Sequence, residues 1–71
     1  MNKPDILVVE DDNAVANLIA ATLETQDYRY KRANTGAGAV MEALSSKPDV
    51  VLLDLGLPDM DGVDVIRKIR S

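Results

Sequence analysis

The sequence has no cysteine, no histidine and no tryptophan, and its only aromatic residues are two tyrosines. Without cysteine, disulfides and thiolate metal sites are excluded. Without histidine, the chain has no imidazole for binding a metal or for acid–base catalysis. Any chemistry at a site of this protein therefore has to be carried by carboxylates, which are plentiful, with 12 Asp and Glu side chains in 71 residues.

Long apolar runs and an excess of positive charge are also missing. No run approaches the roughly 18 apolar residues of a membrane-spanning helix, and the first five residues lack the apolar centre of a secretory signal. The net charge of −4 disfavours binding to a nucleic-acid duplex, because such binding needs a dense positive patch. We therefore expect a cytoplasmic protein that does not contact nucleic acid or membrane directly.

The length and composition describe one small folded domain. A hydrophobic content of 46% with 28% charged residues is typical of a globular sequence. In a chain this short, the gain from burying apolar surface and the entropy lost on folding are of similar size. A monomer is therefore marginally stable unless its packing is very good or a partner completes it.

Three segments have the patterns of β-strands. Residues 6–9 and 50–53 are uncharged aliphatic runs, which suit strands buried on both faces of a parallel sheet. Residues 28–33 alternate aromatic with basic side chains, as in a strand with one solvated face, and their charges suit the edge of a sheet. We therefore place this second strand outermost.

Three further segments have helical spacing. The first spans residues 13–26, and we expect its buried stripe to consist of Val15, Leu18, Ile19, Thr22 and Leu23. The second is expected to bury Ala37, Val40, Met41 and Leu44, and the third follows Gly62 with Val65, Ile66 and Ile69. Strands alternating with helices through short connections predict an α/β fold with a parallel sheet.

The two uncharged strands both end in acidic residues: Glu10 and Asp11 follow the first, and Asp54 follows the third. Binding crevices in parallel sheets lie beyond the carboxyl ends of the strands, so these carboxylates converge if the two strands are neighbours. Carboxylates that lie close together repel one another unless they are protonated, separated or bridged by a cation. A set of oxygen ligands favours a divalent ion of the magnesium class.

A carboxylate beside Mg²⁺ suits phosphoryl transfer, because the metal screens an anionic nucleophile from an anionic phosphoryl group. The simpler alternative is that these acids are helix caps and turn residues on a solvated rim, which fits Asp12 best. Asp59 and Asp61 are expected to be loop and cap residues. A second alternative for the whole chain is a non-catalytic interaction module that binds a protein through an exposed sheet edge.

Residues 6–12 are similar to the first strand and acidic pair of response-regulator receiver domains, the phosphoacceptor part of two-component systems. Residues 51–62 resemble the phosphorylation-site stretch of the same family. Their amino-acid sequence is most similar to that of the OmpR-type transcriptional regulators. The resemblance covers essentially all of residues 1–71. It implies a flavodoxin-like parallel sheet, truncated here to three βα units with strand order 2-1-3.

The resemblance also implies the roles of individual residues. Asp54 is then the phosphoacceptor, which takes a phosphoryl group from the phosphohistidine of a histidine kinase. Mg²⁺ is then held by Glu10, Asp11, the Asp54 carboxylate and the backbone carbonyl of Gly56. Such a domain is a substrate in signalling rather than an enzyme.

The chain departs from the family in one respect, because it ends after the third helix while a full receiver continues. It lacks the Ser or Thr of the fourth strand and the Lys of the fifth, and neither Lys47 nor Lys68 matches the latter. We therefore expect the fragment itself to be impaired in accepting phosphate. We also expect the third strand, at residues 50–53, to be a bare edge through which the chain associates with itself.

Overall fold

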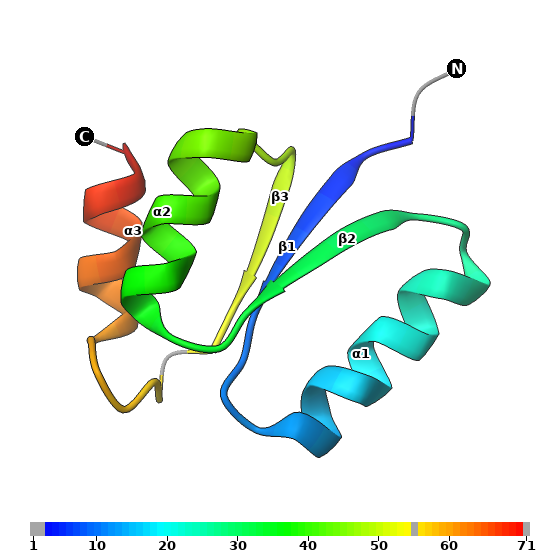
Figure 1. The fold of residues 1–71 in the computed structure, drawn as a ribbon, viewed down its shortest axis with the longest axis horizontal. Helices are drawn as coiled ribbons and strands as arrows, with labels where there is room; N and C mark the ends of the chain where they lie inside the picture. Colours follow the sequence, from blue (N-terminus) through cyan, green and yellow to red (C-terminus); the bar gives the residue numbers. More distant parts are fainter. Residues whose placement is uncertain (1–2, 55, 71) are drawn as a thin grey trace.

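The structure is a computed structural model that describes residues 3–54 and 56–70. Its elements alternate as predicted (Figure 1): β1 (Asp5–Val9), α1 (Asn13–Thr25), β2 (Arg29–Ala33), α2 (Gly36–Ser46), β3 (Val50–Leu53) and α3 (Gly62–Arg70). The predicted boundaries differ from these by a few residues at most. The largest difference is at α3, which begins at Gly62, whereas its apolar pattern begins at Val65. Leu55, which belongs to the phosphorylation-site stretch, lies outside the described residues.

The three strands form one parallel sheet in the order β2-β1-β3. This confirms the flavodoxin-like order and the outer position of the basic strand β2. The central strand β1 pairs with both neighbours, and at its carboxyl end Val9 is aligned with Ala33 on β2 and with Leu53 on β3. The residues that follow Val9 and Leu53 therefore leave the sheet side by side.

Helices cover the two faces of the sheet unequally. Figure 1 shows α2 and α3 on one side of the strands and α1 alone on the other. The face under α2 and α3 holds the larger core cluster, which includes the fully buried Leu7, Val9 and Val65. The face under α1 holds a smaller cluster, in which Ile6, Val8 and Leu23 are buried.

The rotation of α1 differs from the predicted one. Its buried residues are Ala16 and Leu23, with Ile19 packed beside them, whereas Val15 and Leu18 are exposed. The predicted stripe was therefore correct for Ile19 and Leu23 and wrong for Val15, Leu18 and Thr22. The small Ala16 side chain lets the helix lie close to the sheet. The larger side chains of Val15 and Leu18 lie on another face of the helix and remain exposed to solvent.

The predicted rotation of α2 was correct for Val40, which packs against the core, and wrong for Ala37, Met41 and Leu44. The helix buries Gly36, Ala39 and Ala43 between the sheet and α3, while Met41 and Leu44 point into solvent. Small residues are favoured on this face because α2 packs against both β1 and α3, and larger side chains would hold the elements apart. Within the described part of the chain, no helix is long and apolar enough to cross a membrane.

Candidate metal centre

Glu10, Asp11 and Asp54 meet at the carboxyl end of the sheet. Each offers one carboxylate oxygen, and these three atoms lie within 4.8 Å of one another. The sheet ladder continues one residue beyond the strands, since the Glu10 amide donates to the Ala33 carbonyl at 3.0 Å and the Asp54 amide to the Val9 carbonyl at 2.9 Å. The expected convergence of the three acids is therefore observed, and it follows from the pairing of β1 with β3.

Arg32 on β2 fixes the backbone at the start of this site. Its guanidinium donates to the Glu10 carbonyl through Nε at 3.1 Å and through Nη2 at 2.9 Å, and Nη1 donates to the Asn13 side chain at 2.9 Å. The alternating pattern of residues 28–33 predicted Arg32 to be a charge on an edge strand and did not predict this contact. Arg32 lies near the carboxyl end of β2, aligned with Val8, and this position is the feature of the sequence from which the contact could have been predicted.

Hydrogen bonds set the protonation of the acidic cluster. The Gly56 amide donates to Asp54 Oδ1 at 2.9 Å, and this bond is the main reason that the pKa of Asp54 is lowered. The pKa of Glu10 is raised, chiefly because its side chain shares a hydrogen bond with Asp54. The two pKa values are therefore shifted in opposite directions, as expected for two acidic groups that lie close together.

The ligand set at this site fits a hard divalent cation. All three side chains offer carboxylate oxygens, and the sequence has no histidine or cysteine to attract a softer metal. A bound cation would offset the repulsion between these neighbouring carboxylates. The predicted fourth ligand, the Gly56 backbone carbonyl, lies two residues after Asp54 and stays a prediction.

The neighbouring acids have structural roles. Asp12 is the N-cap of α1, since its Oδ1 accepts the Ala14 amide at 2.8 Å and the Val15 amide at 3.1 Å. Asp61 accepts the Val63 amide at 2.9 Å in the first turn of α3. Both residues therefore serve as helix caps, as the sequence predicted.

Asp59 also caps a helix, but one that is distant in sequence. Its two carboxylate oxygens accept the Gly36 amide at 2.8 Å and the Ala37 amide at 3.1 Å at the N-terminus of α2. These amides lower the pKa of Asp59. The loop before α3 is thereby tied to α2, which also has its local cap at Thr35.

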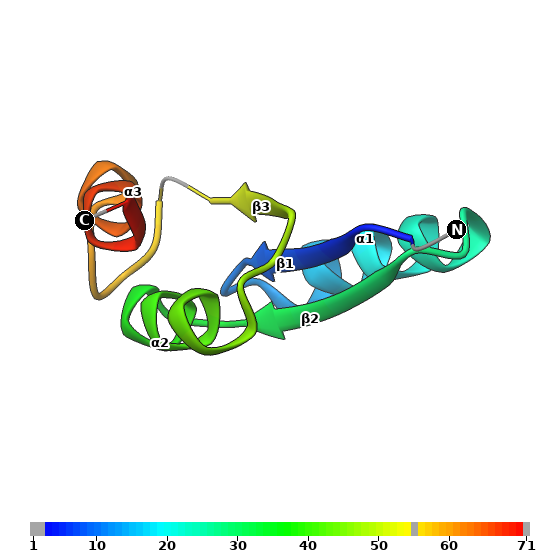
Figure 2. The ribbon, with the colours of Figure 1, turned by 90° about the horizontal axis from the view of Figure 1, so that it is seen from above.

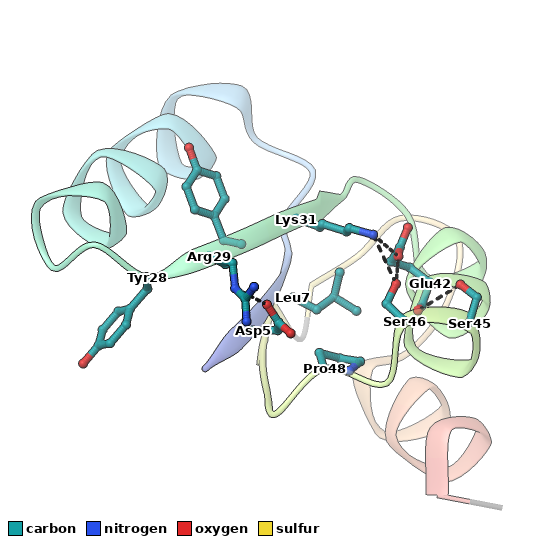
Figure 3. A pocket seen from close by; sticks show the side chains of 10 residues that line it. Asp5, Leu7, Tyr28, Arg29, Lys31, Glu42, Ser45, Ser46 and Pro48 are labelled. Atoms are coloured by element: carbon teal, nitrogen blue, oxygen red, sulfur yellow. Dashed lines mark hydrogen bonds and ion pairs between the residues drawn. The ribbon is translucent and has the colours of Figure 1, made fainter. Parts of the chain in front are cut away.

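A groove of about 900 Å³ lies elsewhere, between β2 and the C-terminal end of α2 (Figure 3). Its charged side chains pair with one another: Arg29 with Asp5 at 3.1 Å, and Lys31 with Glu42 at 3.4 Å. Ser46 adds a hydroxyl that donates to Glu42. The positive charges of Arg29 and Lys31 are therefore neutralised by neighbouring acids. Glu10, Asp11 and Asp54 do not line this groove.

The family model of the response regulator receiver domain matches residues 6–71. The chain belongs to this family. Among curated relatives, the transcriptional regulatory protein KdpE of Mycobacterium tuberculosis (strain ATCC 25618 / H37Rv) is 43% identical over 66 residues, which are 93% of this chain and 29% of the relative. KdpE of Escherichia coli (strain K12) is 41% identical over 67 residues, which are 94% of this chain and 30% of the relative.

Solved receiver structures have the same fold. The receiver domain of the sensor histidine kinase PA1611 from Pseudomonas aeruginosa PAO1, described with a magnesium ion coordinated in its active-site cleft, is 35% identical with a TM-score of 0.91. That match covers 97% of this chain and 57% of the solved one. The resemblance to OmpR-type receivers is thus confirmed, and the chain spans under a third of the length of these curated relatives.

Proposed function

We propose that Asp54 accepts a phosphoryl group from the phosphohistidine of a histidine kinase, with Mg²⁺ bound beside it. The observation that carries this proposal is the meeting of Glu10, Asp11 and Asp54 within 4.8 Å at the carboxyl edge of a receiver sheet. The magnesium ion in the cleft of the P. aeruginosa receiver supports the same choice of metal.

In the proposed reaction, a carboxylate oxygen of Asp54 forms a bond to phosphorus while the bond between the phosphorus and the histidine nitrogen breaks. The lowered pKa of Asp54 keeps its carboxylate ionised, which is the form that acts as a nucleophile. The Gly56 amide holds Oδ1 and thereby orients the carboxylate. Arg32 of β2 positions the Glu10 backbone by donating two hydrogen bonds to its carbonyl.

Glu10, Asp11, Asp54 and the Gly56 backbone carbonyl would hold the ion. Mg²⁺ supplies positive charge that offsets the repulsion between the acidic cluster and the anionic phosphoryl group. The chain is then the substrate of a transfer reaction, and the kinase supplies the donor. Because the curated relatives are transcriptional regulators, the output that we propose for the intact protein is control of transcription in the cytoplasm, with nucleic acid contacted outside this segment.

A magnesium titration followed by amide NMR tests the metal site. We expect the amides of Glu10, Asp11, Asp54 and Gly56 to shift in the parent chain. Asp54→Asn should weaken binding by about tenfold or more, because it removes one of three carboxylate ligands. Asp64→Asn, which removes an exposed acid from the first turn of α3, is the matched control and should bind like the parent. Equal affinity for all three chains would favour the interaction-module alternative.

Incubation with acetyl phosphate and Mg²⁺, followed by intact mass, tests the phosphoacceptor. We expect slow and partial gain of one phosphoryl group by the parent chain and none by Asp54→Asn. Modification is slow because residues 1–71 supply no side chain equivalent to the phosphoryl-binding Ser or Thr and Lys of the family's later strands. Labelling of Asp54→Asn at the parent's rate would refute the assignment, and rapid complete labelling of the parent would refute the impairment.

A further inference from the structure

Arg32 makes contacts of a different kind from those of the other two basic residues of β2. Arg29 and Lys31 each pair with a carboxylate. Arg32 instead directs its guanidinium to two neutral oxygens, the backbone carbonyl of Glu10 and the side-chain amide of Asn13. A charge on an edge strand discourages aggregation wherever the side chain points. The directed contacts of Arg32 are therefore an additional feature of this residue.

The guanidinium of Arg32 holds both ends of the connection from β1 to α1. Figure 2 shows this connection, in blue, near the carboxyl end of β2. Nε and Nη2 donate to the Glu10 carbonyl, and Nη1 donates to Asn13 Oδ1 at 2.9 Å. Because the planar guanidinium carries its donors in a fixed arrangement, it sets the separation of the two acceptors. Asp11 and Asp12 lie between these acceptors in sequence and belong to a segment that is fixed at both ends.

The Glu10 carbonyl belongs to the peptide group that joins Glu10 to Asp11, the first two acids of the candidate metal centre. A peptide group is planar, so fixing its oxygen sets the direction in which the chain leaves Glu10. It thereby limits the positions open to the Asp11 side chain. The Glu10 amide donates to the Ala33 carbonyl at 3.0 Å. Both backbone polar groups of Glu10 are thus bonded to adjacent residues of β2, Arg32 and Ala33.

The contact with Arg32 holds Glu10 without using its carboxylate. One carboxylate oxygen from each of Glu10, Asp11 and Asp54 lies within 4.8 Å of the others. An arginine paired directly with one of these carboxylates would compete with a divalent cation for its oxygens. By binding the backbone carbonyl instead, Arg32 orders the acids and leaves their oxygens directed toward one another.

We propose, as an extension of the proposed function, that Arg32 is a positioning residue of the metal centre. By holding the peptide group between Glu10 and Asp11, it keeps both carboxylates where they can bind Mg²⁺ together with Asp54. Groups that orient metal ligands without touching the metal typically raise metal affinity by about tenfold or more. The positive charge of Arg32 has the opposite effect, since a nearby cation weakens the binding of another cation. The geometric and electrostatic effects of Arg32 on Mg²⁺ affinity therefore differ in sign.

A magnesium titration of Arg32→Ala, followed by amide NMR, separates these two effects. We expect Arg32→Ala to bind Mg²⁺ about threefold to tenfold more weakly than the parent chain, because the positioning contact is lost. Loss of the charge alone would make binding tighter. Arg32→Lys keeps the charge and loses the planar group, and it should also bind more weakly than the parent. Circular dichroism verifies that each variant is folded at the temperature of the titration.

Arg29→Ala is the matched control. It removes the same side chain and the same charge from the same strand, but Arg29 pairs with Asp5 at the amino end of β1, away from the acidic cluster. We expect it to bind Mg²⁺ like the parent.

Order parameters of the Asp11 and Asp12 amides, measured by NMR without metal, provide a second readout. They should fall in Arg32→Ala and keep the parent values in Arg29→Ala, because only Arg32 holds this connection. A purely stabilising role for Arg32 would leave the order parameters of the folded chain unchanged, and that result would overturn the proposal.

The titration also distinguishes failure of this role from failure of the proposed function. A parent chain that binds no Mg²⁺ refutes the proposed metal site and the role of Arg32 with it. A parent chain that binds Mg²⁺, together with an Arg32→Ala or Arg32→Lys chain of equal or higher affinity, leaves the metal site standing and overturns the role of Arg32 alone.

Discussion

The two faces of the sheet differ in how completely they are covered. Among the residues that the structure describes, the buried cluster under α2 and α3 has seven members, whereas the buried cluster under α1 has three. On the first face, Leu7 and Val9 are almost fully buried; on the second, neighbouring aliphatic residues of β3 remain partly exposed. The α2–α3 face therefore holds the larger core, and we expect it to contribute more to the stability of this chain than the α1 face does.

The acidic cluster depends on both faces, because it lies at the edge where they meet. Glu10 and Asp11 begin the connection to α1, and Asp54 begins the connection to α3. Loss of either core would disturb the pairing of β1 with β3 that brings the carboxylates together.

Replacing one leucine on each face by alanine tests whether the two faces contribute unequally to stability. Leu7→Ala should lower the free energy of unfolding by about 2–5 kcal/mol, because Leu7 of β1 is almost fully buried in the core beneath α2. A loss of this size is comparable to the whole stability of a domain this small. Leu52→Ala should cost about 1 kcal/mol, since Leu52 is 39% exposed. Urea unfolding by circular dichroism at low protein concentration measures both. Equal losses would show that the faces contribute equally.

A smaller effect is expected from adding one methyl group where α2 meets α3. A Cβ on Gly36 would lie 2.7 Å from Met60 Cβ and 3.1 Å from a methyl of Val65, so Gly36→Ala should destabilise the fold by about 1–3 kcal/mol. The control is Gly38→Ala in the same helix, where the added atom meets only the Thr35 hydroxyl, at 3.0 Å. A midpoint of urea unfolding for Gly36→Ala no lower than that for Gly38→Ala would contradict the tight packing of this face.

The smallest expected effect concerns the Asp59 carboxylate, which links the α3 loop to α2. Because the Gly36 and Ala37 amides lower its pKa in the folded state below the ordinary 3.8, ionised Asp59 stabilises the fold above that value. This contribution should disappear as the pH falls through the lowered folded-state pKa. The difference in unfolding free energy between the parent and Asp59→Asn should thus be constant near neutral pH and shrink in acid.

Thermal unfolding at a series of pH values checks this prediction. Asp64→Asn serves as the control for the loss of one negative charge, because Asp64 is an exposed acid in the first turn of α3. A parent-to-variant difference for Asp59 that stays the same from neutral pH down to strong acid would show that its bonds to α2 do not depend on ionisation.

Much of the fold and of the candidate site was predictable because it rests on local patterns. The uncharged strands and the short connections between elements imply a parallel sheet, and acids at the ends of two such strands imply a shared edge. The capping roles of Asp12 and Asp61 follow from their positions just before helices. The contact of Arg32 with the Glu10 backbone and the helix that Asp59 caps were not predicted, because these partners are distant in sequence and become neighbours only when the fold is assembled.

The order of the elements and the placement of the carboxylates at strand ends could be predicted from local sequence, since hydrophobic periodicity and turn chemistry are local properties. The rotation of α1 and α2 could not, because it is set by packing between elements that are distant in sequence. Helical spacing indicates which apolar residues share a face, but the buried face is chosen by the closeness of the neighbouring elements. Close packing selected Ala16, Ala39 and Ala43, and left Leu18 and Met41 in solvent.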